Sequence, residues 1–407
     1  MNILIISFTF PPYSGIGGRR WAKFAKYLQK NGNDVEVLAA KSGFEKKSPW
    51  TSDVSQIKVS YHEAGYPQYL GIQPKSLIEK IAYRLSLVYS KWITKGNYYD
   101  KSAHWRKGLK SIVEEKVAEG IDQVFVTCAP FHMAYHLLPL VKKYRNIKWV
   151  VDFRDPWTTN RTSYGFENLS NERQQFELNA EKEVVKNYDE VISVAEPMTD
   201  YFKTLEPNNP QKFKTIFNGF DPDDSPKRTQ NQHPDPGFFT FVFAGTLYDK
   251  ALPAFKIFCQ AVENLKIEDT ELYNKLKFNF IGTNQEKVNN LRHPNISILP
   301  FLPFEKVRDY LYTANAGLLF LTPDIDWSFS TKFTDYIASE LPILVVSEKG
   351  SKTGEFCEEN HLGYDLNKQN IEILRKLLID LEKDETHLSK NLKRKFSIQF
   401  SAKEILD

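Results

Sequence analysis

Short apolar runs that alternate with helix-patterned segments are the feature that most constrains this fold. The chain opens on an apolar run, Met1–Phe10, as expected of a parallel strand that is covered on both faces. A glycine-bearing loop follows, Arg19–Asn31 then repeats apolar residues at helical spacing, and Asp34–Ala40 is a second apolar run. This succession of strand, loop, helix and strand predicts the start of a doubly wound α/β sheet.

The same alternation continues in two series, separated by a loop rich in Pro and Asp at 221–237. The further strand-like runs are 124–128, 149–153, 190–194, 239–245, 277–282, 296–299, 316–321 and 342–347. We therefore expect an α/β protein with two doubly wound, Rossmann-like domains that face each other across a cleft, and ligands outside the carboxyl ends of the strands. We place the first domain at 1–205 and the second at 206–385, and we expect 386–407 to include a helix that packs back on the first domain.

Charge and cysteine content exclude several classes of protein. Lys and Arg number 54 against 51 Asp and Glu, a net charge of +3, so nothing predicts a nucleic-acid partner. Cys128, Cys259 and Cys357 are far apart and odd in number, as in reduced cytosolic proteins. No basic segment precedes the apolar start, and no apolar run reaches the roughly 18 residues of a membrane span. We therefore expect a cytoplasmic protein.

The loop after the first strand carries Gly15, Gly17 and Gly18. Glycines let the backbone approach a ligand closely, and the N-terminus of the following helix attracts anions. The spacing differs from the dinucleotide fingerprint, and no acidic residue follows where a ribose would bind. The loop predicts either contact with an anion or a turn that only lets the helix pack. Of Arg19 and Arg20, we expect at least one to be solvated.

Residues 152–157, with the sequence DFRDPW, lie where a buried strand ends and a loop begins. Three charges and a Trp are costly to bury there without partners. Arg154 stands between Asp152 and Asp155 and can pair with them. The segment predicts either an ion pair that braces a loop, or a carboxylate that orients a hydroxyl or acts as a general base.

A lysine at the start of a helix marks a second candidate site. Ser330 or Thr331 is a candidate N-cap, which puts Lys332 in the first turn, where a cation opposes the helix dipole unless an anion binds there. Asp335 follows one turn later. A lysine for phosphate and a carboxylate for a sugar diol suit a nucleotide-sugar, whereas the alternative is an ordinary i,i+3 ion pair.

A second lysine can serve the same anion. The segment 243–250, FAGTLYDK, places Gly245 at a strand end and Lys250 close behind it. Lys250 and Lys332 together could offset the charge of a departing diphosphate. The Asp-x-Asp sequence at 324–326 is expected to be solvated, because a hard cation needs more oxygen ligands. We therefore expect neither a catalytic metal nor a cofactor.

The segment 75–107 is strongly basic, with eight basic and two acidic residues. Its helix-spaced apolar residues are Leu77, Ile81, Leu85, Val88, Tyr89 and Trp92. The pattern predicts either an amphipathic helix that covers the sheet, which is the preferred interpretation, or a helix that lies on an anionic membrane.

Five segments in a specific order resemble one enzyme family. They are 1–18, 152–157, 216–221 (IFNGFD), 243–247 and 331–338 (TKFTDYIA). Together they resemble GT-B-fold glycosyltransferases of the family-four type, which transfer sugars from nucleotide-sugar donors with retention of anomeric configuration. The resemblance implies a retaining hexosyltransferase that takes a UDP- or GDP-sugar and serves cell-surface polysaccharide assembly.

The resemblance also implies roles for individual residues. It places the ribose on Asp335, the diphosphate on Lys332 and Lys250, and the base near Leu302. The implied donor-binding residues are Gly17, Gly18, Gly245, Thr246, Gly282, Leu302, Thr331 and Asp335. Those implied near a glycan or lipid-linked acceptor are Arg19, Trp105, His132 and Arg154. The implied catalytic residues are Asp155, Lys332 and Lys250, with Asp155 where the family places an acceptor-side polar residue.

One departure from the family pattern separates this chain from an ordinary member. Eight residues before Asp335 the chain has Trp327, where the family has the glutamate that touches the donor sugar, and Asp324 or Asp326 could substitute. Two alternatives therefore stay open, a nucleotide-sugar 2-epimerase and a non-catalytic binding subunit. Peripheral membrane association through 75–107 also stays open.

The aromatic content, 14% of the chain, is expected to divide into two shares. The share expected in the core includes Phe239, Phe241, Phe243, Phe278 and Phe280. The share expected to face an acceptor or a lipid carrier is Tyr83, Tyr89, Trp92, Tyr98, Tyr99, Trp105 and Trp157.

Overall fold

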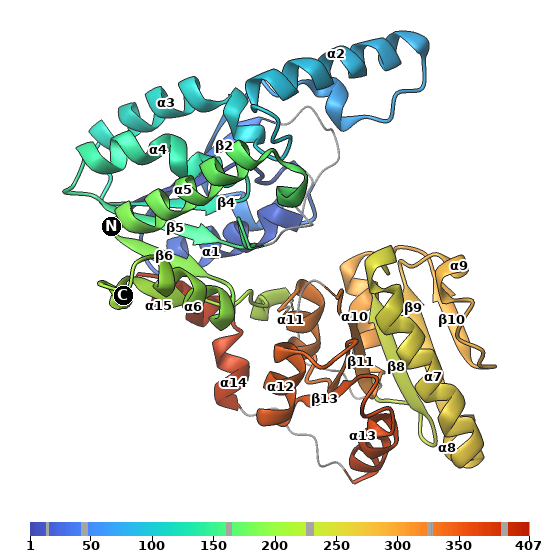
Figure 1. The fold of residues 1–407 in the computed structure, drawn as a ribbon. Coiled ribbons are helices and arrows are strands. Elements are labelled where there is room, and N and C mark those ends of the chain that lie inside the picture. Colours follow the sequence, from blue (N-terminus) through green and yellow to red (C-terminus); the bar gives the residue numbers. More distant parts are fainter. Residues whose placement is uncertain are drawn as a thin grey trace. The chain divides into compact units, whose positions relative to one another are not determined.

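The chain divides into two compact α/β units (Figure 1). The computed structural model describes residues 1–13, 16–41, 48–159, 165–224, 232–323, 327, 329–383 and 390–406. Unit 1 comprises Met1–Phe217 and the last residues from Ala402, and unit 2 comprises Asn218–Ser401. Among the described residues, no helix is long and apolar enough to cross a membrane.

Unit 1 is built on a seven-stranded parallel sheet in the order β3-β2-β1-β4-β5-β6-β7. Its strands are β1 Asn2–Ser7, β2 Asp34–Lys41, β3 Lys58–Glu63, β4 Gln123–Cys128, β5 Lys148–Phe153, β6 Glu190–Ser193 and β7 Phe213–Thr215. The strand order reverses between β1 and β4, and in such sheets ligands bind outside the carboxyl ends at the reversal. The loops after β1 and β4 are therefore where a ligand of this unit is expected to bind.

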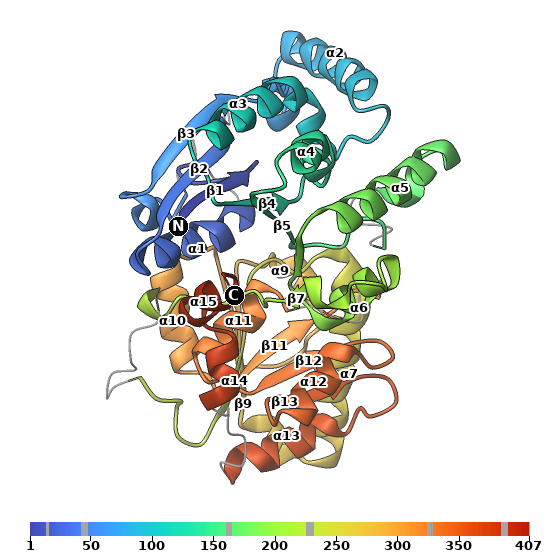
Figure 2. The same ribbon diagram turned by 90° about the vertical axis from the view of Figure 1, so that its left-hand side faces the viewer.

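Six α-helices belong to the described part of unit 1. They are α1 Arg19–Lys30, α2 Leu77–Ile93, α3 Arg106–Ala118, α4 His132–Lys143, α5 Asn171–Asn187 and α6 Glu196–Leu205. Short 3-10 turns are η1 Ile16–Gly18, η2 Ser52–Val54, η3 Gln68–Gly71, η4 Lys101–His104, η5 Phe166–Asn168 and η6 Pro210–Lys212. The helices α3, α4 and α5 lie side by side, whereas α2 projects from the edge of the unit (Figure 1, Figure 2).

Unit 2 is built on a six-stranded parallel sheet in the order β10-β9-β8-β11-β12-β13. Its strands are β8 Phe239–Ala244, β9 Leu276–Ile281, β10 Ile296–Leu299, β11 Ala316–Phe320, β12 Ile343–Val346 and β13 Gly363–Leu366. Its helices and turns are η7 Pro222–Asp224, η8 Asp249–Ala251, α7 Leu252–Glu268, α8 Thr270–Asn274, α9 Gln285–Val288, α10 Phe304–Tyr312, α11 Thr331–Ala338, α12 Lys352–Glu359, α13 Ile373–Glu382 and α14 Lys390–Lys395. The last helix, α15 Ile398–Glu404, spans the point where the chain returns to unit 1.

Aromatic rings fill the core of unit 2. Phe241 on β8 stacks on Phe278 on β9 with 5.7 Å between ring centroids, and Phe258 of α7 meets Phe278 edge to face at 5.6 Å. The residues expected in this core, Phe239, Phe241, Phe243, Phe278 and Phe280, are all buried. That expectation is confirmed.

The two doubly wound parallel sheets confirm the predicted fold class, and three strands appear that the sequence pattern did not indicate. The edge strand β3 alternates polar and apolar residues and is only half-buried, while β7 and β13 are short. Residues 213–215, expected in the second domain, pair with β6 in the first sheet. The predicted boundary at 205/206 therefore lies between α6 and the last strand of unit 1.

Candidate functional site

Two glycines follow neighbouring strands at the carboxyl edge of the unit 2 sheet. Gly245 follows β8 with φ +125°, and Gly282 follows β9 with φ +78°, both in the region that favours glycine. The Gly245 N–H donates to the Ile281 carbonyl over 2.7 Å, and Thr283 Oγ1 donates to the Gly245 carbonyl over 2.6 Å. A Cβ on Gly282 would lie 3.7 Å from the Gly245 Cα. The two loops are thus held together, and both glycines are half-buried.

Lys332 lies directly over Gly245. A Cβ added to Gly245 would approach Lys332 Cε to 2.6 Å, so the glycine makes room for the lysine side chain. Lys332 Nζ lies 5.3 Å from the centroid of the Phe243 ring. Burial lowers the pKa of Lys332, and the nearby Asp335 charge opposes that shift. A cation that is partly desolvated therefore lies at the carboxyl end of β8.

Tyr336 fixes the helix that carries Lys332. Its hydroxyl donates to the Leu318 carbonyl over 2.9 Å, and its ring fills the place of a side chain on Gly317, where a Cβ would lie 2.6 Å away. Lys332 precedes Tyr336 by one helical turn and so lies on the same face of α11. The buried tyrosine therefore aims the lysine at the strand ends.

The N-terminus of α11 has no side-chain cap. Ser330 occupies the N-cap position and makes no capping hydrogen bond, and its buried Oγ has no hydrogen-bond partner among the described residues. The first N–H groups of a helix without a cap can bind an anion. The predicted donor residue Thr331 starts this helix, and Asp335 is half-buried one turn later.

The other residues predicted for the donor lie at the rim of this edge. Phe301 Cδ2 would lie 3.7 Å from a Cβ added to Gly282, and the Phe301 side chain is 87% exposed. Leu302 beside it is half-buried. Thr246 and Lys250 are exposed, with Lys250 in the turn η8. Trp327 is half-buried. Gly15 and the two candidate substitutes, Asp324 and Asp326, lie outside the described residues.

In unit 1, Arg154 ties the loop after β1 to the loop after β4. Its Nη1 donates to the Gly17 carbonyl over 2.5 Å, its Nε to the Cys128 carbonyl over 3.1 Å, and its Nη2 to the Ala129 carbonyl over 2.9 Å. A Cβ on Gly17 would lie 2.6 Å from Nη1, so that glycine makes room for the guanidinium. Arg154 is predicted near the acceptor. All three of these donors bind backbone carbonyls in or next to the loops after β1 and β4, where the strand order reverses.

Asp152 pairs with Arg20 rather than with Arg154. Arg20 Nη2 lies 2.9 Å from Asp152 Oδ1, and Trp21 Nε1 donates to Oδ2 over 2.7 Å. Arg20 also donates to the carbonyls of residues 216 and 217. Arg19 and Arg20 are both buried, so the expectation that at least one is solvated is wrong. The α1 start turns both side chains inward, and for Arg20 a buried carboxylate and two carbonyls satisfy the guanidinium.

His132, predicted near the acceptor, belongs to a buried charged cluster at the start of α4. Its Nε2 lies 2.7 Å from Glu177 Oε2 and its Nδ1 lies 3.3 Å from Asp100 Oδ1. Burial disfavours the charged imidazole, but Asp100 and Glu177 outweigh it and raise the pKa of His132. Burial likewise opposes ionisation of Glu177, yet its hydrogen bond to His132 and the charges of His132 and Arg173 lower its pKa to about 2. A cavity of about 10 Å³, about one water molecule in size, lies beside His132, Glu177 and Trp157.

Glu181 is a second buried carboxyl on α5, one turn after Glu177. Tyr201 donates to it over 2.8 Å, and Thr158 also donates through its hydroxyl. Burial raises the pKa of Glu181 to about 7, which these hydrogen bonds only partly oppose. The sequence indicated a long polar helix here and missed both acids. Their spacing of four residues on one helix face was the available signal.

Three further residues predicted on the acceptor side differ in exposure. Trp105 and Trp157 are buried, at 2% and 3% exposed, so the expectation that they face an acceptor or lipid is wrong. Their rings pack in unit 1, where Trp157 lies parallel to Phe131 and donates to Glu177 over 2.8 Å. Asp155 is half-buried and directly follows Arg154 in the loop after β5.

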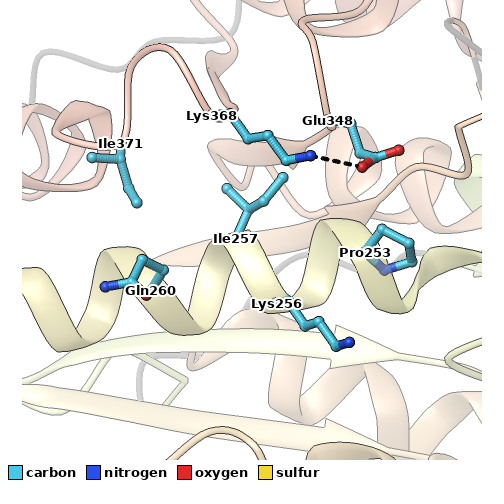
Figure 3. A pocket seen from close by; sticks show the side chains of 7 residues that line it. All are labelled: Pro253, Lys256, Ile257, Gln260, Glu348, Lys368 and Ile371. Carbon is cyan, nitrogen blue, oxygen red and sulfur yellow. Dashed lines mark hydrogen bonds and ion pairs between the residues drawn. The ribbon is translucent and has the colours of Figure 1, made fainter.

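A separate hollow of about 440 Å³ lies beside α7 in unit 2 (Figure 3). Its lining residues are Pro253, Lys256, Ile257, Gln260, Glu348, Lys368 and Ile371. Lys368 Nζ already pairs with Glu348 Oε1 at 3.0 Å. None of the predicted donor residues lines this hollow.

No protein-family model matches the chain, and no curated protein matches its sequence. Solved structures do match it over nearly its whole length. Sucrose-phosphate synthase from Thermosynechococcus elongatus is 13% identical with a TM-score of 0.60, covering 99% of this chain and 97% of that one. The UDP-forming α,α-trehalose-phosphate synthase from Burkholderia xenovorans, in complex with glucose-6-phosphate, is 10% identical with a TM-score of 0.58, covering 100% and 99%.

A third similar structure comes from a protein assigned as a UDP-N-acetylglucosamine 2-epimerase in Listeria monocytogenes. It is 13% identical with a TM-score of 0.55 and covers 100% of this chain and 94% of that one. At such identities the likeness concerns the fold, which is the GT-B architecture of two Rossmann-like α/β domains.

Proposed function

We propose that this chain is a glycosyltransferase that takes a sugar from a nucleoside-diphosphate donor and passes it to a glycan or lipid-linked acceptor. The observation that carries the proposal is Lys332, held over Gly245 at the carboxyl end of β8 and beside a helix N-terminus that lacks a side-chain cap. A diphosphate needs fixed positive charge and free N–H donors, and this edge of unit 2 offers both. The sequence resemblance points to the same residues.

The donor would bind in three parts along this edge. The diphosphate would lie on Lys332, the α11 N–H groups and the Gly245 loop, with Lys250 as a second cation. The ribose would lie on Asp335, and the base near Leu302 and the exposed ring of Phe301. As the sugar leaves, negative charge grows on the diphosphate, and a partly desolvated lysine stabilises that charge more strongly than one in water. We keep the expectation that lysines rather than a metal ion supply this charge.

Transfer would be retaining and would need no protein nucleophile. The leaving phosphate oxygen would accept the proton of the acceptor hydroxyl on the face where the new bond forms. Asp155 would orient that hydroxyl, while Arg154 holds the loop that carries it. Because His132 and Trp105 are buried, we assign them to positioning this side of unit 1 rather than to contact with the acceptor.

A thermal-shift screen of UDP, GDP and their sugars tests the proposal. We expect one nucleotide to raise the unfolding temperature, and its sugar to be turned over when glycan or lipid-linked acceptors are supplied. Asp335→Ala should weaken nucleotide binding because the ribose hydroxyls lose their partner. Unchanged nucleotide affinity in that variant would refute the ribose assignment.

Two other functions each have one supporting observation. The likeness to a structure assigned as a 2-epimerase favours isomerisation of the donor itself, which would proceed with no acceptor present. The presence of Trp327 in place of the family glutamate favours a subunit that binds without catalysis. Incubation with donor alone separates the first from transfer, and nucleotide binding without turnover on any acceptor would indicate the second.

A further inference from the structure

The helix α2, Leu77–Ile93, leaves its apolar side uncovered. Its exposed apolar residues include Leu77 (75%), Ile78 (77%), Ile81 (52%), Leu85 (66%), Val88 (70%), Tyr89 (49%) and Trp92 (75%). Ser90 is its one buried residue. The helix projects from the edge of unit 1 in both views (Figure 1, Figure 2). The preferred interpretation of this segment, a helix that covers the sheet, is therefore wrong.

These apolar side chains form one continuous stripe. At 3.6 residues per turn, the seven residues fall within an arc of about 120°, with Trp92 at its centre, and the buried Ser90 lies on the opposite side. We call these seven residues the α2 stripe. Contiguous exposed apolar surface on a folded protein marks a contact with a partner or a membrane.

Basic residues line one edge of the α2 stripe. Lys80, Arg84 and Lys91 fall within an arc of about 40° beside it, and all three are exposed. Long basic side chains at such an edge can extend their charge toward headgroups while their stems lie on the apolar layer.

The acidic residues near the α2 stripe are already engaged in contacts within the protein. In the segment 75–107 all eight basic residues are exposed, whereas the acids are Glu79 and Asp100. Glu79 caps the start of α2 by accepting the Ser76 N–H over 3.0 Å, and Asp100 is buried. The exposed charge around the α2 stripe is therefore basic.

We propose that α2 is a docking element for an anionic lipid surface, lying in its plane with the α2 stripe in the headgroup and upper acyl region. The apolar stripe, its central tryptophan and the basic edge each match a property of such a surface. A second copy of the chain fits less well, because antiparallel pairing of two stripes would bring their basic edges together. The proposal concerns α2 alone and does not depend on glycosyl transfer.

Vesicle flotation of the full chain tests the proposal. We expect retention on vesicles of phosphatidylcholine with phosphatidylglycerol, weak retention on phosphatidylcholine alone, and loss of retention in high salt. The double variant Leu85→Glu with Trp92→Glu should no longer float. Ile267→Glu is the matched control, since Ile267 is 83% exposed on another helix, and it should float like the wild type.

A triple variant separates the charge from the apolar stripe. Lys80→Gln with Arg84→Gln and Lys91→Gln should lower the partition coefficient on the order of 100-fold, because each cation near an anionic surface contributes about fivefold. All substituted residues are exposed, so circular dichroism and thermal unfolding should match the wild type.

Three outcomes would overturn the proposal. The first is no retention of the wild type on anionic vesicles, and the second is equal retention of the Leu85→Glu, Trp92→Glu variant. The third is a wild type that binds no vesicles but forms a dimer, where the same double variant is a monomer. Tryptophan emission gives an independent check. Vesicles should shift the emission to shorter wavelength in the wild type and not in Trp92→Phe, which should still float.

Discussion

Replacing Glu181 with Gln should change how the stability of unit 1 depends on pH. Glu181 is 1% exposed, and burial raises its pKa to about 7 from its ordinary value of 4.5. The unfolded chain therefore releases this proton near pH 4.5 and the folded chain holds it to about 7. Between these values folding requires proton uptake, so stability is lost as pH rises. The difference of 2.5 pKa units corresponds to about 3 kcal/mol at 1.36 kcal/mol per unit.

Urea unfolding of wild type and Glu181→Gln at several pH values from 4.5 to 8 measures this effect. The neutral amide has no proton to release, so the free energy of unfolding of the variant relative to wild type should rise by about 3 kcal/mol across the range. Glu183→Gln is the matched control, because the Glu183 side chain is 47% exposed on the same helix with Lys142 at 3.3 Å, and its difference from wild type should stay nearly flat. A flat difference for Glu181→Gln as well would show that the pKa of Glu181 is not raised in the folded chain.

Three further predictions concern the loops that form the candidate site. Gly245→Ala should lose about 1–3 kcal/mol of stability from its positive φ and also weaken nucleotide binding by displacing Lys332. Gly237→Ala is its control, because Gly237 also has a positive φ, of +83°, but no atom lies within 4 Å of the new Cβ. This variant should lower the unfolding temperature and leave the affinity for UDP unchanged. Arg154→Lys cannot replace three donors on three carbonyls and should cost about 1–3 kcal/mol by urea unfolding, whereas Arg145→Lys at the surface should cost little. Because burial lowers the pKa of Lys332, its charge and the nucleotide affinity should be lost at a lower pH than for an ordinary lysine, and Lys332→Arg should extend binding to higher pH in the same titration.

The sequence indicated the sheets well where strands are buried on both faces. The runs at β1 and β2 are almost wholly buried, so their composition alone distinguishes them from loops. The edge strand β3 shows the limit, since KVSYHE alternates on a half-buried edge and lacks a continuous apolar signal. Periodicity also identified α2 as amphipathic, but it could not tell whether another part of the chain covers the apolar side.

The residues of the candidate sites were predicted where the signal is local and missed where it depends on distant segments. Lys332 and Gly245 were predicted because a helix start and a strand end are local features. The partners of Asp152 and Glu177 were missed, because they come from distant segments, Arg20 for the first and His132 for the second. The burial of a charged residue cannot be predicted from sequence until its partner is known, and only the fold brings the partner to it.

Calorimetric titration of UDP and GDP into three forms of the chain tests whether Lys332 binds the donor diphosphate. The wild type should bind one of the nucleotides, and Lys332→Ala should bind it about 10- to 100-fold more weakly, since a charged hydrogen bond is lost. Lys368→Ala, which removes a lysine from the separate hollow of the same unit, should bind like the wild type. Equal affinities of Lys332→Ala and wild type, or a loss confined to Lys368→Ala, would contradict the account.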